Sequence, residues 1–385
     1  MPKLINLLRV VTIGASKQIH GISDESNLRR SIAWLTVAQD ATEVGGVSAW
    51  YSYLRGWGEP FIETTGYTIS TFLRASNYFN DKKLINRAIA MGDYVVSMQH
   101  SSGGYRTYPP TQMSESNPTE FNTGQDILGL ADLYEVTHNK KYLESLILAA
   151  DFLVKIQNSD GTWTEYTYGG KARTYNTRVS WALLRSWQLT NKISYRDAAR
   201  KNLKWALSRQ LKNGWFRDNA LPYPNPIDPY THTIAYVLEG LLGCYDILHD
   251  EIYFLAAQKT ADKLLEIFQL HHFMAGTYDS NWHSKDHYSC LTGDAQIAGV
   301  WLTLYSLTHN RKYIVSAREM IDYLNRRQCT EPAPELFGAI AGSWPIFGDL
   351  LHHTGYCRLA YPNWAAKFYC DALLGMLQQT EEQHE

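Results

Sequence analysis

The chain has 385 residues, of which 45% are hydrophobic and 19% charged, a balance typical of a globular protein with a large core. A formal net charge of -2 excludes a global field that would attract nucleic acid or an anionic membrane. No run of 18 apolar residues is present, so no membrane span is expected. The five cysteines are scattered without a CxxC pair, which favours a reduced, cytoplasmic location over a periplasmic or secreted one.

Two kinds of helix alternate along the chain. Six amphipathic helices carry apolar residues at spacings of three and four, as expected of helices with one wet face. Their apolar stripes begin at Leu28, Leu84, Tyr142, Tyr195, Ala257 and Tyr313. Six more apolar helices open on small polar residues and are predicted to be buried. They begin at Thr64, Phe121, Thr174, Tyr230, Cys290 and Tyr361. The starts are roughly 55 to 70 residues apart, a spacing that indicates a repeated pair of helices.

This alternation predicts an all-α protein, an (α/α)6 toroid or six-hairpin barrel with outer and inner helices. An open superhelix of the same pairs is the alternative. Terminal repeats of an open solenoid need polar caps, whereas the last inner helix is as apolar as the others, which favours closure. No Pro/Ser-rich linker divides the chain. Residues 25–380 are therefore predicted to form a single toroid domain, and residues 1–24 a loosely attached lead-in.

The ends of the outer helices repeat as well. Most carry a Gln followed by a Gly and an aromatic residue, as in Gln99, Gly104 and Tyr105. The Gly is expected to supply the left-handed turn that ends the helix. The other copies begin at Gln39, Gln157, Gln210 and Gln269.

In such a toroid the inner helices run parallel, so their N-termini meet at one end. Each N-terminus carries about half a positive charge and free N–H groups, which suit anions or hydroxyl-rich ligands. Aromatic faces and planar polar groups at these positions are typical of a sugar site. The candidate catalytic residues are His232, Tyr236, His287, Tyr175 and Glu63. The candidate substrate-binding residues are Asn122, Gln125, Asn176, Arg178, Arg217, Lys285 and Trp364.

Each candidate also has a purely structural interpretation. Asn122 and Gln125 match a helix cap with its capping box. Arg178, inside an apolar helix, requires a partner and is equally consistent with an ion pair between helices. His232 fits a hydrogen-bonded core histidine, and Glu63 a favourable charge near a helix N-terminus. The high aromatic content, 13%, fits either a lined cleft or a thick core.

The densest group of titratable residues is the segment YDSNWHSKDHYSCLTGD, from Tyr278 to Asp294. A zinc site there would need three or four converging ligands, and His283, His287 and Cys290 are the candidates. A solvated loop with one catalytic His is the favoured interpretation, so neither a metal nor a cofactor is expected. Walker, GxGxxG, GxSxG and HExxH motifs are missing, as is an Asp-rich diphosphate motif.

Several segments carry a resemblance to a known family: YNTRVSWALL, NGWFRDNAL, YTHTIAYVLEGLL, CLTGDAQIAGVWL and YPNWAAKFYCDALL. They resemble the VpsJ-type bacterial polysaccharide-biosynthesis proteins, within the six-hairpin glycosidase and polysaccharide-lyase-like group. The resemblance runs from about Thr64 to Leu377. It implies an α,α-toroid that builds or trims an exopolysaccharide, lipopolysaccharide or capsule. The segment FGAIAGSWPIFGDLLHHTGY departs from the Gly-rich form expected in that family.

The favoured function is an enzyme that abstracts a proton next to the carboxylate of a uronate-containing glycan, either a lyase or an epimerase. Such chemistry needs a cation, a base and an acid. The cations would be Arg178, Arg217 and Lys285, the base His232 or His287, and the acid Tyr236 or Tyr175.

Two alternatives remain open. A glycoside hydrolase would use paired carboxylates, about 5 Å apart for retention or about 6.5 to 9.5 Å for inversion. The candidates are Glu63, Glu120, Asp218, Glu239 and Asp294. A non-catalytic protein would instead bind a glycan or a biosynthetic partner. In each case the expected partner is an oligo- or polysaccharide.

Overall fold

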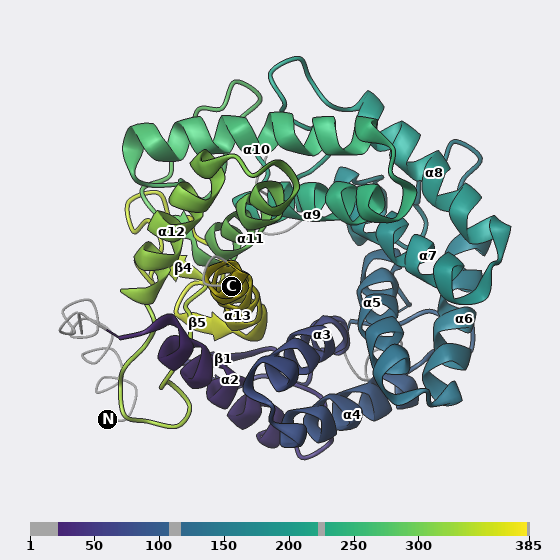
Figure 1. Cartoon of the computed structure of the whole chain (residues 1–385), viewed down its shortest axis with the longest axis horizontal. Coiled ribbons are helices and arrows are strands. Elements are labelled where there is room, and N and C mark those ends of the chain that lie inside the picture. Colours follow the sequence, from purple (N-terminus) through teal and green to yellow (C-terminus); the bar gives the residue numbers. More distant parts are fainter. Residues whose placement is uncertain (1–21, 108–116, 222–227, 383–385) are drawn as a thin grey trace.

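The computed structural model describes residues 22–107, 117–221 and 228–382. Within these ranges, twelve α-helices form two concentric rings, seen from one end in Figure 1. The outer ring consists of α2 (Asp24–Asp40), α4 (Lys82–Ser97), α6 (Lys140–Lys155), α8 (Ile193–Ser208), α10 (Glu251–His271) and α12 (Arg311–Asn325). The inner ring consists of α3 (Ile62–Phe79), α5 (Glu120–Thr137), α7 (Thr177–Thr190), α9 (Thr231–Leu248), α11 (Leu291–Thr308) and α13 (Asn363–Glu382). The predicted (α/α)6 toroid is confirmed, and every inner helix begins within three residues of its predicted start.

The ring is closed. Each inner helix packs against the next one along the chain, and the last, α13, packs against both α3 and α2 (Figure 1). An open superhelix is thereby excluded. The predicted lead-in, residues 1–24, lies outside the described residues apart from its last three positions. No helix of the described ranges is long and apolar enough to span a membrane.

The apolar patterns explain which helices lie inside. In α9, every residue from Thr231 to Leu238 is buried, because this helix touches other elements on all sides. In the outer helix α6, the stripe of Leu146, Ala149 and Leu153 is fully buried, whereas Leu148 on the opposite face is exposed. The aromatic content serves both predicted roles, since Trp34, Trp163 and Trp301 are enclosed in the core while other rings line a cavity described below.

A glutamine near the end of each outer helix connects that helix to the next one. Gln39 Nε2 donates to the carbonyl of Gly45 in its own turn, at 2.8 Å, and to that of Arg87 on α4, at 3.1 Å. The corresponding bonds run from Gln99 to Ser145, from Gln157 to Ala198, from Gln210 to Ala256 and from Gln269 to Ser316. Gln328 Nε2 donates to the carbonyl of Asn27 on α2, at 2.8 Å, and so completes the circle.

The turns that follow these glutamines hold a glycine at positive φ, except after Gln269, where the left-handed residue is His272. Gly103 has φ +98°, and a Cβ there would lie 2.4 Å from the carbonyl oxygen of Leu148 on the next outer helix. Gly161 has φ +90° and is as close to Lys201. The prediction that a left-handed Gly104 ends the helix is wrong, because α4 already ends at Ser97 and its cap, Met98, has φ -93°. The left-handed glycine is Gly103, in the turn that follows.

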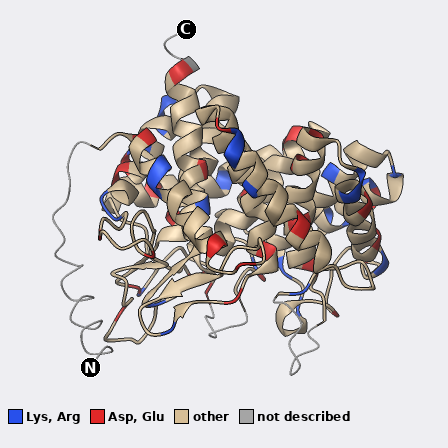
Figure 2. Ribbon diagram, turned by 90° about the horizontal axis from the view of Figure 1, so that it is seen from below, with Lys and Arg blue, Asp and Glu red and all other residues tan. Residues whose placement is uncertain are grey.

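Short strands and loops collect on one side of the helices, as Figure 2 shows. One sheet has the order β2 (Gly56–Trp57), β1 (Trp50–Ser52) and β5 (Ala360–Pro362), and the other pairs β3 (Ser289–Cys290) with β4 (Ser343–Trp344). All pairs are antiparallel. Since β3 leads directly into α11 and β5 into α13, these segments lie at the end of the ring where the inner helices begin.

Candidate active site

A cavity of about 290 Å³ lies where the inner helices begin. We call it the mouth cavity. Its walls come from the first two turns of α3 and α9, from the first turns of α5 and α13, from the 3-10 turn that precedes α7, and from loops. They consist of Phe61, Glu63, Thr64, Tyr67, Phe121, Tyr168, Tyr175, Leu221, His232, Tyr236, Tyr356 and Trp364. An aromatic wall with a few polar groups is the usual make-up of a small-molecule site.

Five of the predicted site residues meet in this cavity. They come from four separate stretches of the sequence and are Glu63, Tyr175, the α9 pair His232 and Tyr236, and Trp364. The predicted convergence of inner-helix starts therefore has a physical counterpart, because parallel inner helices bring their first turns to one end of the ring.

His232 is held as a neutral base. Its Nδ1 lies 2.5 Å from Gln296 Oε1 on α11, and Gln296 Nε2 donates to Glu239 at 3.1 Å. Because the amide nitrogen serves Glu239, its oxygen is left to accept, so Nδ1 carries the hydrogen and Nε2 keeps a lone pair. Burial, with a smaller contribution from the charge of Arg178, lowers the pKa of His232 to about 3.

The pKa of Glu63 is shifted in the opposite direction from that of His232, which favours the protonated form. Burial raises the pKa of this carboxyl group to about 8, against the opposing effect of Arg178, and Glu120 adds to the rise. Its side chain makes no hydrogen bond within the described part of the chain, although it faces the mouth cavity. At neutral pH, Glu63 is therefore a protonated acid in the same space as a neutral histidine.

Arg178 and Gln125 belong to a polar network below the mouth cavity. Arg178 Nε donates to Gln125 Oε1 at 2.7 Å, and its guanidinium pairs with Glu239. The guanidinium carbon lies 5.0 Å from the ring centre of Tyr236. Arg178 faces a second cavity of about 520 Å³, which extends toward the other end of the ring. The predicted ion pair between helices is thus present, and the Arg178 side chain does not line the mouth cavity.

Asn122 and Asn176 lie beside the cavity, within hydrogen-bond networks. Asn122 Nδ2 donates to Thr107 Oγ1 at 3.0 Å, and Asn122 Oδ1 accepts from Tyr168 at 3.2 Å. The capping interpretation of Asn122 is wrong, because α5 begins at Glu120 and Asn122 is already inside the helix. Asn176 Nδ2 donates to Glu120 Oε1 at 3.1 Å.

The remaining three predicted site residues lie away from the mouth cavity and from its networks. Arg217 and Lys285 are exposed, and so is His287, in the segment before β3. The backbone explains why Arg217 lies away from the cavity. Its N–H donates to the carbonyl of Arg209, so the residue belongs to the turn after α8 and not to the start of an inner helix. Proximity in sequence to an inner helix was not sufficient to bring a loop residue to the cavity.

Two residues at or beside the mouth cavity were not predicted from the sequence. Tyr356 lies in the loop between β4 and β5, and no pattern in the sequence predicts the course of this loop. The Tyr356 hydroxyl accepts a hydrogen bond from Trp364 Nε1 at 2.9 Å. Gln296, which orients His232, lies beyond the first turn of α11, and only its place opposite α9 in the ring reveals its role. A search for polar residues one turn beyond each inner start would have included it.

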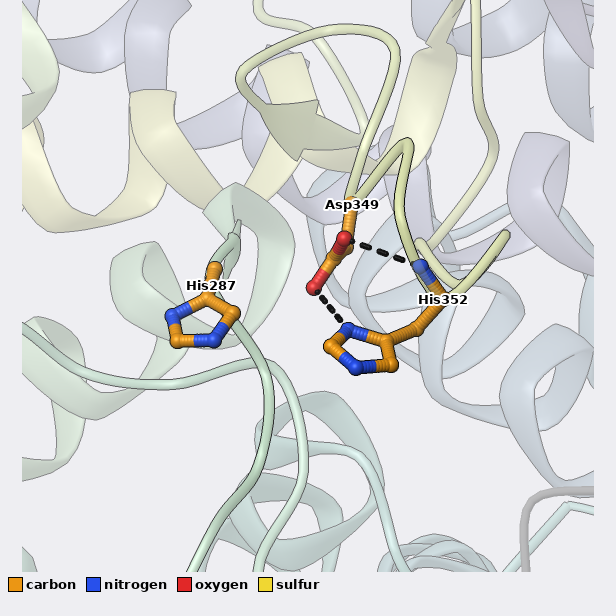
Figure 3. Close-up of side chains that lie close together, drawn as sticks. All are labelled: His287, Asp349 and His352. Carbon is orange, nitrogen blue, oxygen red and sulfur yellow. Dashed lines mark hydrogen bonds and ion pairs between the residues drawn. The ribbon is translucent and has the colours of Figure 1, made fainter.

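The predicted metal candidates do not converge. Cys290 is buried in β3, and His283 Nδ1 lies 3.9 Å from Asp279. Among the described residues, His287 instead gathers with Asp349 and His352, as Figure 3 shows.

Comparison with known proteins supports the fold. A family model described as pectic acid lyase matches residues 122–182, from α5 into α7. No curated protein matches the chain. A crystal structure of an unsaturated glucuronyl hydrolase specific for heparin is similar, with a TM-score of 0.72, 16% identity, and coverage of 93% of this chain and 98% of that one.

Two further structures are similar over nearly their whole length. A D-mannose isomerase has a TM-score of 0.70 and 14% identity, covering 92% of this chain and 97% of that one. The GH76 α-mannanase of Bacteroides thetaiotaomicron has a TM-score of 0.68 and 14% identity, covering 96% and 99%. The chain shares their fold. The relatives in this fold group include glycosyl hydrolases, a polysaccharide lyase and an isomerase, while the closer resemblance to VpsJ-type proteins stays a prediction.

Proposed function

We propose that this protein is a carbohydrate-active enzyme that abstracts a proton from a uronate-containing glycan in the mouth cavity, as a lyase or an epimerase. The observation that carries the proposal is the pairing of a neutral base, His232, with a protonated acid, Glu63, in one aromatic cavity. A cavity of about 290 Å³ is at the lower end of the usual range of about 300–1,000 Å³ for ligand sites, which favours a single sugar unit or a chain end.

The two groups supply the two proton transfers. His232 Nε2 removes the C5 proton next to the carboxylate, and Glu63 delivers a proton to the leaving oxygen in elimination, or to the opposite face of C5 in epimerisation. The predicted acids, Tyr236 and Tyr175, suit this role less well, because burial raises the pKa of both phenols well above the usual value. Their hydroxyl groups are better suited to hold the sugar.

The carboxylate of the substrate needs positive charge near it. Arg178 supplies part of it from below, since its charge opposes the rise in the pKa of Glu63 and helps to lower the pKa of His232. The first turns of the inner helices add their N–H groups at the same end. Arg217 and Lys285 are exposed and would act only on parts of a glycan outside the cavity.

The comparisons agree with this choice of substrate class. The matching family model is named for pectic acid lyase, and one similar structure for an unsaturated glucuronyl hydrolase specific for heparin. Together with the resemblance to VpsJ-type proteins, they support a role in building or trimming a bacterial polysaccharide.

A glycoside hydrolase is the second candidate. Both Glu63 and Glu120 have a pKa raised to about 8 by burial, which suits a general acid. However, Glu120 is fully enclosed and bonded to Asn176, and among the described residues that line the cavity Glu63 is the one carboxyl group. Hydrolysis would need a second carboxylate that faces the substrate.

The test is incubation of the protein with uronate polymers and oligosaccharides. A lyase raises ultraviolet absorbance through unsaturated chain ends, and an epimerase incorporates solvent deuterium at C5 without cleavage. His232→Ala should abolish either signal while circular dichroism shows an intact helical fold. Release of sugar from a neutral glycan, with neither signal on any uronate substrate, would overturn the proposal in favour of hydrolysis. Binding without turnover of any glycan would favour a non-catalytic protein.

A further inference from the structure

We propose that His287, Asp349 and His352 form a binding site for a divalent transition metal of the zinc class. Each residue offers one ligand atom, and these atoms all lie within 4.8 Å of one another. His287 belongs to the segment before β3, and the other two belong to the loop between β4 and β5, so the site joins two separate parts of the chain (Figure 3). The inference is independent of the proposed function.

The carboxylate at the centre of the site is fixed in place. Asp349 Oδ1 accepts from the backbone N–H groups of Leu351 and His352, at 2.9 and 3.1 Å, and Oδ2 accepts from His352 Nδ1 at 2.8 Å. Its side chain is only 3% exposed. The N–H of Asp349 donates to the carbonyl of Thr354 at 2.8 Å and closes the small hairpin. Such backbone support is what orients a metal ligand in advance.

The two imidazoles are placed to close around an ion. The rings of His287 and His352 lie side by side, with centres 6.0 Å apart and planes inclined by 28°. Tetrahedral zinc, with bonds of about 2.0–2.2 Å, needs ligand atoms about 3.4 Å apart. Both histidines are exposed, so their side chains can rotate at the fixed carboxylate. His352 Nδ1 already lies 2.8 Å from Asp349 Oδ2, and metal binding through this nitrogen would replace that hydrogen bond.

The donor set defines the class of ion. Two imidazole nitrogens and one carboxylate oxygen suit zinc and its neighbours in the first transition row, whereas magnesium and calcium prefer oxygen ligands alone. Three protein ligands leave a fourth position for water. This differs from the expectation of no metal, which considered His283, His287 and Cys290 and could not anticipate a partner from the loop between β4 and β5.

A metal ion at this site would hold in place the loop between β4 and β5, which also forms part of the mouth cavity. The same loop carries Tyr356, whose N–H donates to Ser343 Oγ at 2.6 Å and whose ring lines the cavity. A metal ion would attach the hairpin of this loop to the segment before β3, and so stabilise one edge of the cavity wall. The ion itself is assigned a structural role.

The test uses the full chain, stripped with a chelator and dialysed against zinc, with metal content measured by elemental analysis and cobalt(II) absorption as a second readout. Wild type should retain one zinc per chain. His287→Ala and His352→Ala should weaken binding at least about 10- to 100-fold, the loss expected even for an outer-shell partner. His283→Ala is the matched control, since that exposed histidine lies in the same segment, outside the cluster.

Both histidine variants change exposed side chains, so they are expected to fold, and circular dichroism checks this. No stoichiometric zinc in the wild type would overturn the proposal. Equal loss in His283→Ala would do so as well, because it would indicate nonspecific binding by surface histidines.

Discussion

One side-chain amide decides which nitrogen of His232 can act as a base. Gln296 donates to Glu239 and accepts from His232, so the histidine is fixed as the tautomer with a free Nε2. Burial then keeps the ring neutral and keeps Glu63 protonated, which gives an acid and a base that coexist at neutral pH.

The pH dependence of turnover follows from these two pKa values. His232 is unprotonated above about pH 3, and Glu63 is protonated below about pH 8. We expect kcat/KM to be level between these limits and to fall as the pH rises through about 8. Glu63→Gln should lose turnover at every pH.

The control for this profile is Glu120→Gln, because Glu120 also has a pKa of about 8 but is sealed from the cavity. The control should keep the fall in activity, moved to a somewhat lower pH because the charge of Glu120 no longer adds to the rise in the pKa of Glu63. If the fall disappeared in Glu120→Gln and persisted in Glu63→Gln, the assignment of the acid would be wrong.

The same carboxyl group affects stability. Its pKa is about 4.5 in the unfolded chain and about 8 in the folded one, so the folded state binds the proton more tightly. The free energy of unfolding should therefore fall as the pH rises from about 4.5 to about 8. In Glu63→Gln this fall should be smaller, as measured by urea unfolding at a series of pH values. An unchanged pH dependence would contradict the buried, protonated state.

At the scale of elements, a network of side chains joins four consecutive inner helices. Arg178 on α7 connects Gln125 on α5 to Glu239 on α9, and Gln296 extends the network to α11. A charged side chain among the apolar inner helices needs such partners, because an unpaired buried charge lowers the stability of the fold.

Removal of one partner should be more damaging than removal of both. Arg178→Met leaves Glu239 without its cation and should lower the free energy of unfolding by about 3–5 kcal/mol, toward the lower end because Glu239 is 18% exposed. The double variant with Glu239→Met should recover much of this loss. Arg29→Met, in an exposed pair with Glu25, serves as the control and should cost less than about 1 kcal/mol. Equal losses in the single and double variants would contradict the role of the pair.

At the scale of the whole molecule, closure makes every repeat an internal one. The six glutamines at the ends of the outer helices form a continuous circle, and Gln328 is the link between the last outer helix and the first. It was missed in the sequence because its glycine, Gly338, follows at a larger spacing than in the other copies.

Because the ring is closed, we expect the glutamine bond between the last and first outer helices to stabilise the fold as much as a bond between two central outer helices. Gln328→Ala removes the donor to the buried carbonyl of Asn27 and should cost about 1–3 kcal/mol, similar to Gln210→Ala between α8 and α10. Thermal unfolding of the two variants measures this. A neutral Gln328→Ala beside a destabilised Gln210→Ala would indicate that the ends of the ring separate readily.

The periodicity of apolar residues was sufficient to predict the alternating rings, since a helix that is apolar all round has to be enclosed. Parallel inner helices then required Glu63, Tyr175, His232, Tyr236 and Trp364 to meet at one end, because each lies within the first two turns of an inner helix or just before one. Regular helices carry this information, as a residue's place in the repeat determines its height and direction.

Contacts between distant segments depended on the tertiary structure alone. The partner of Arg178, the orientation of His232 by Gln296, and the meeting of His287 with Asp349 and His352 each join stretches that no local pattern relates. Loops have no period that fixes the direction of their side chains, which is why Arg217 and Lys285 lie away from the cavity and Tyr356 lies in it. The sequence by itself determined the ring and the end at which the inner helices begin, whereas the packing of helices and loops around that end decided which side chains face one another.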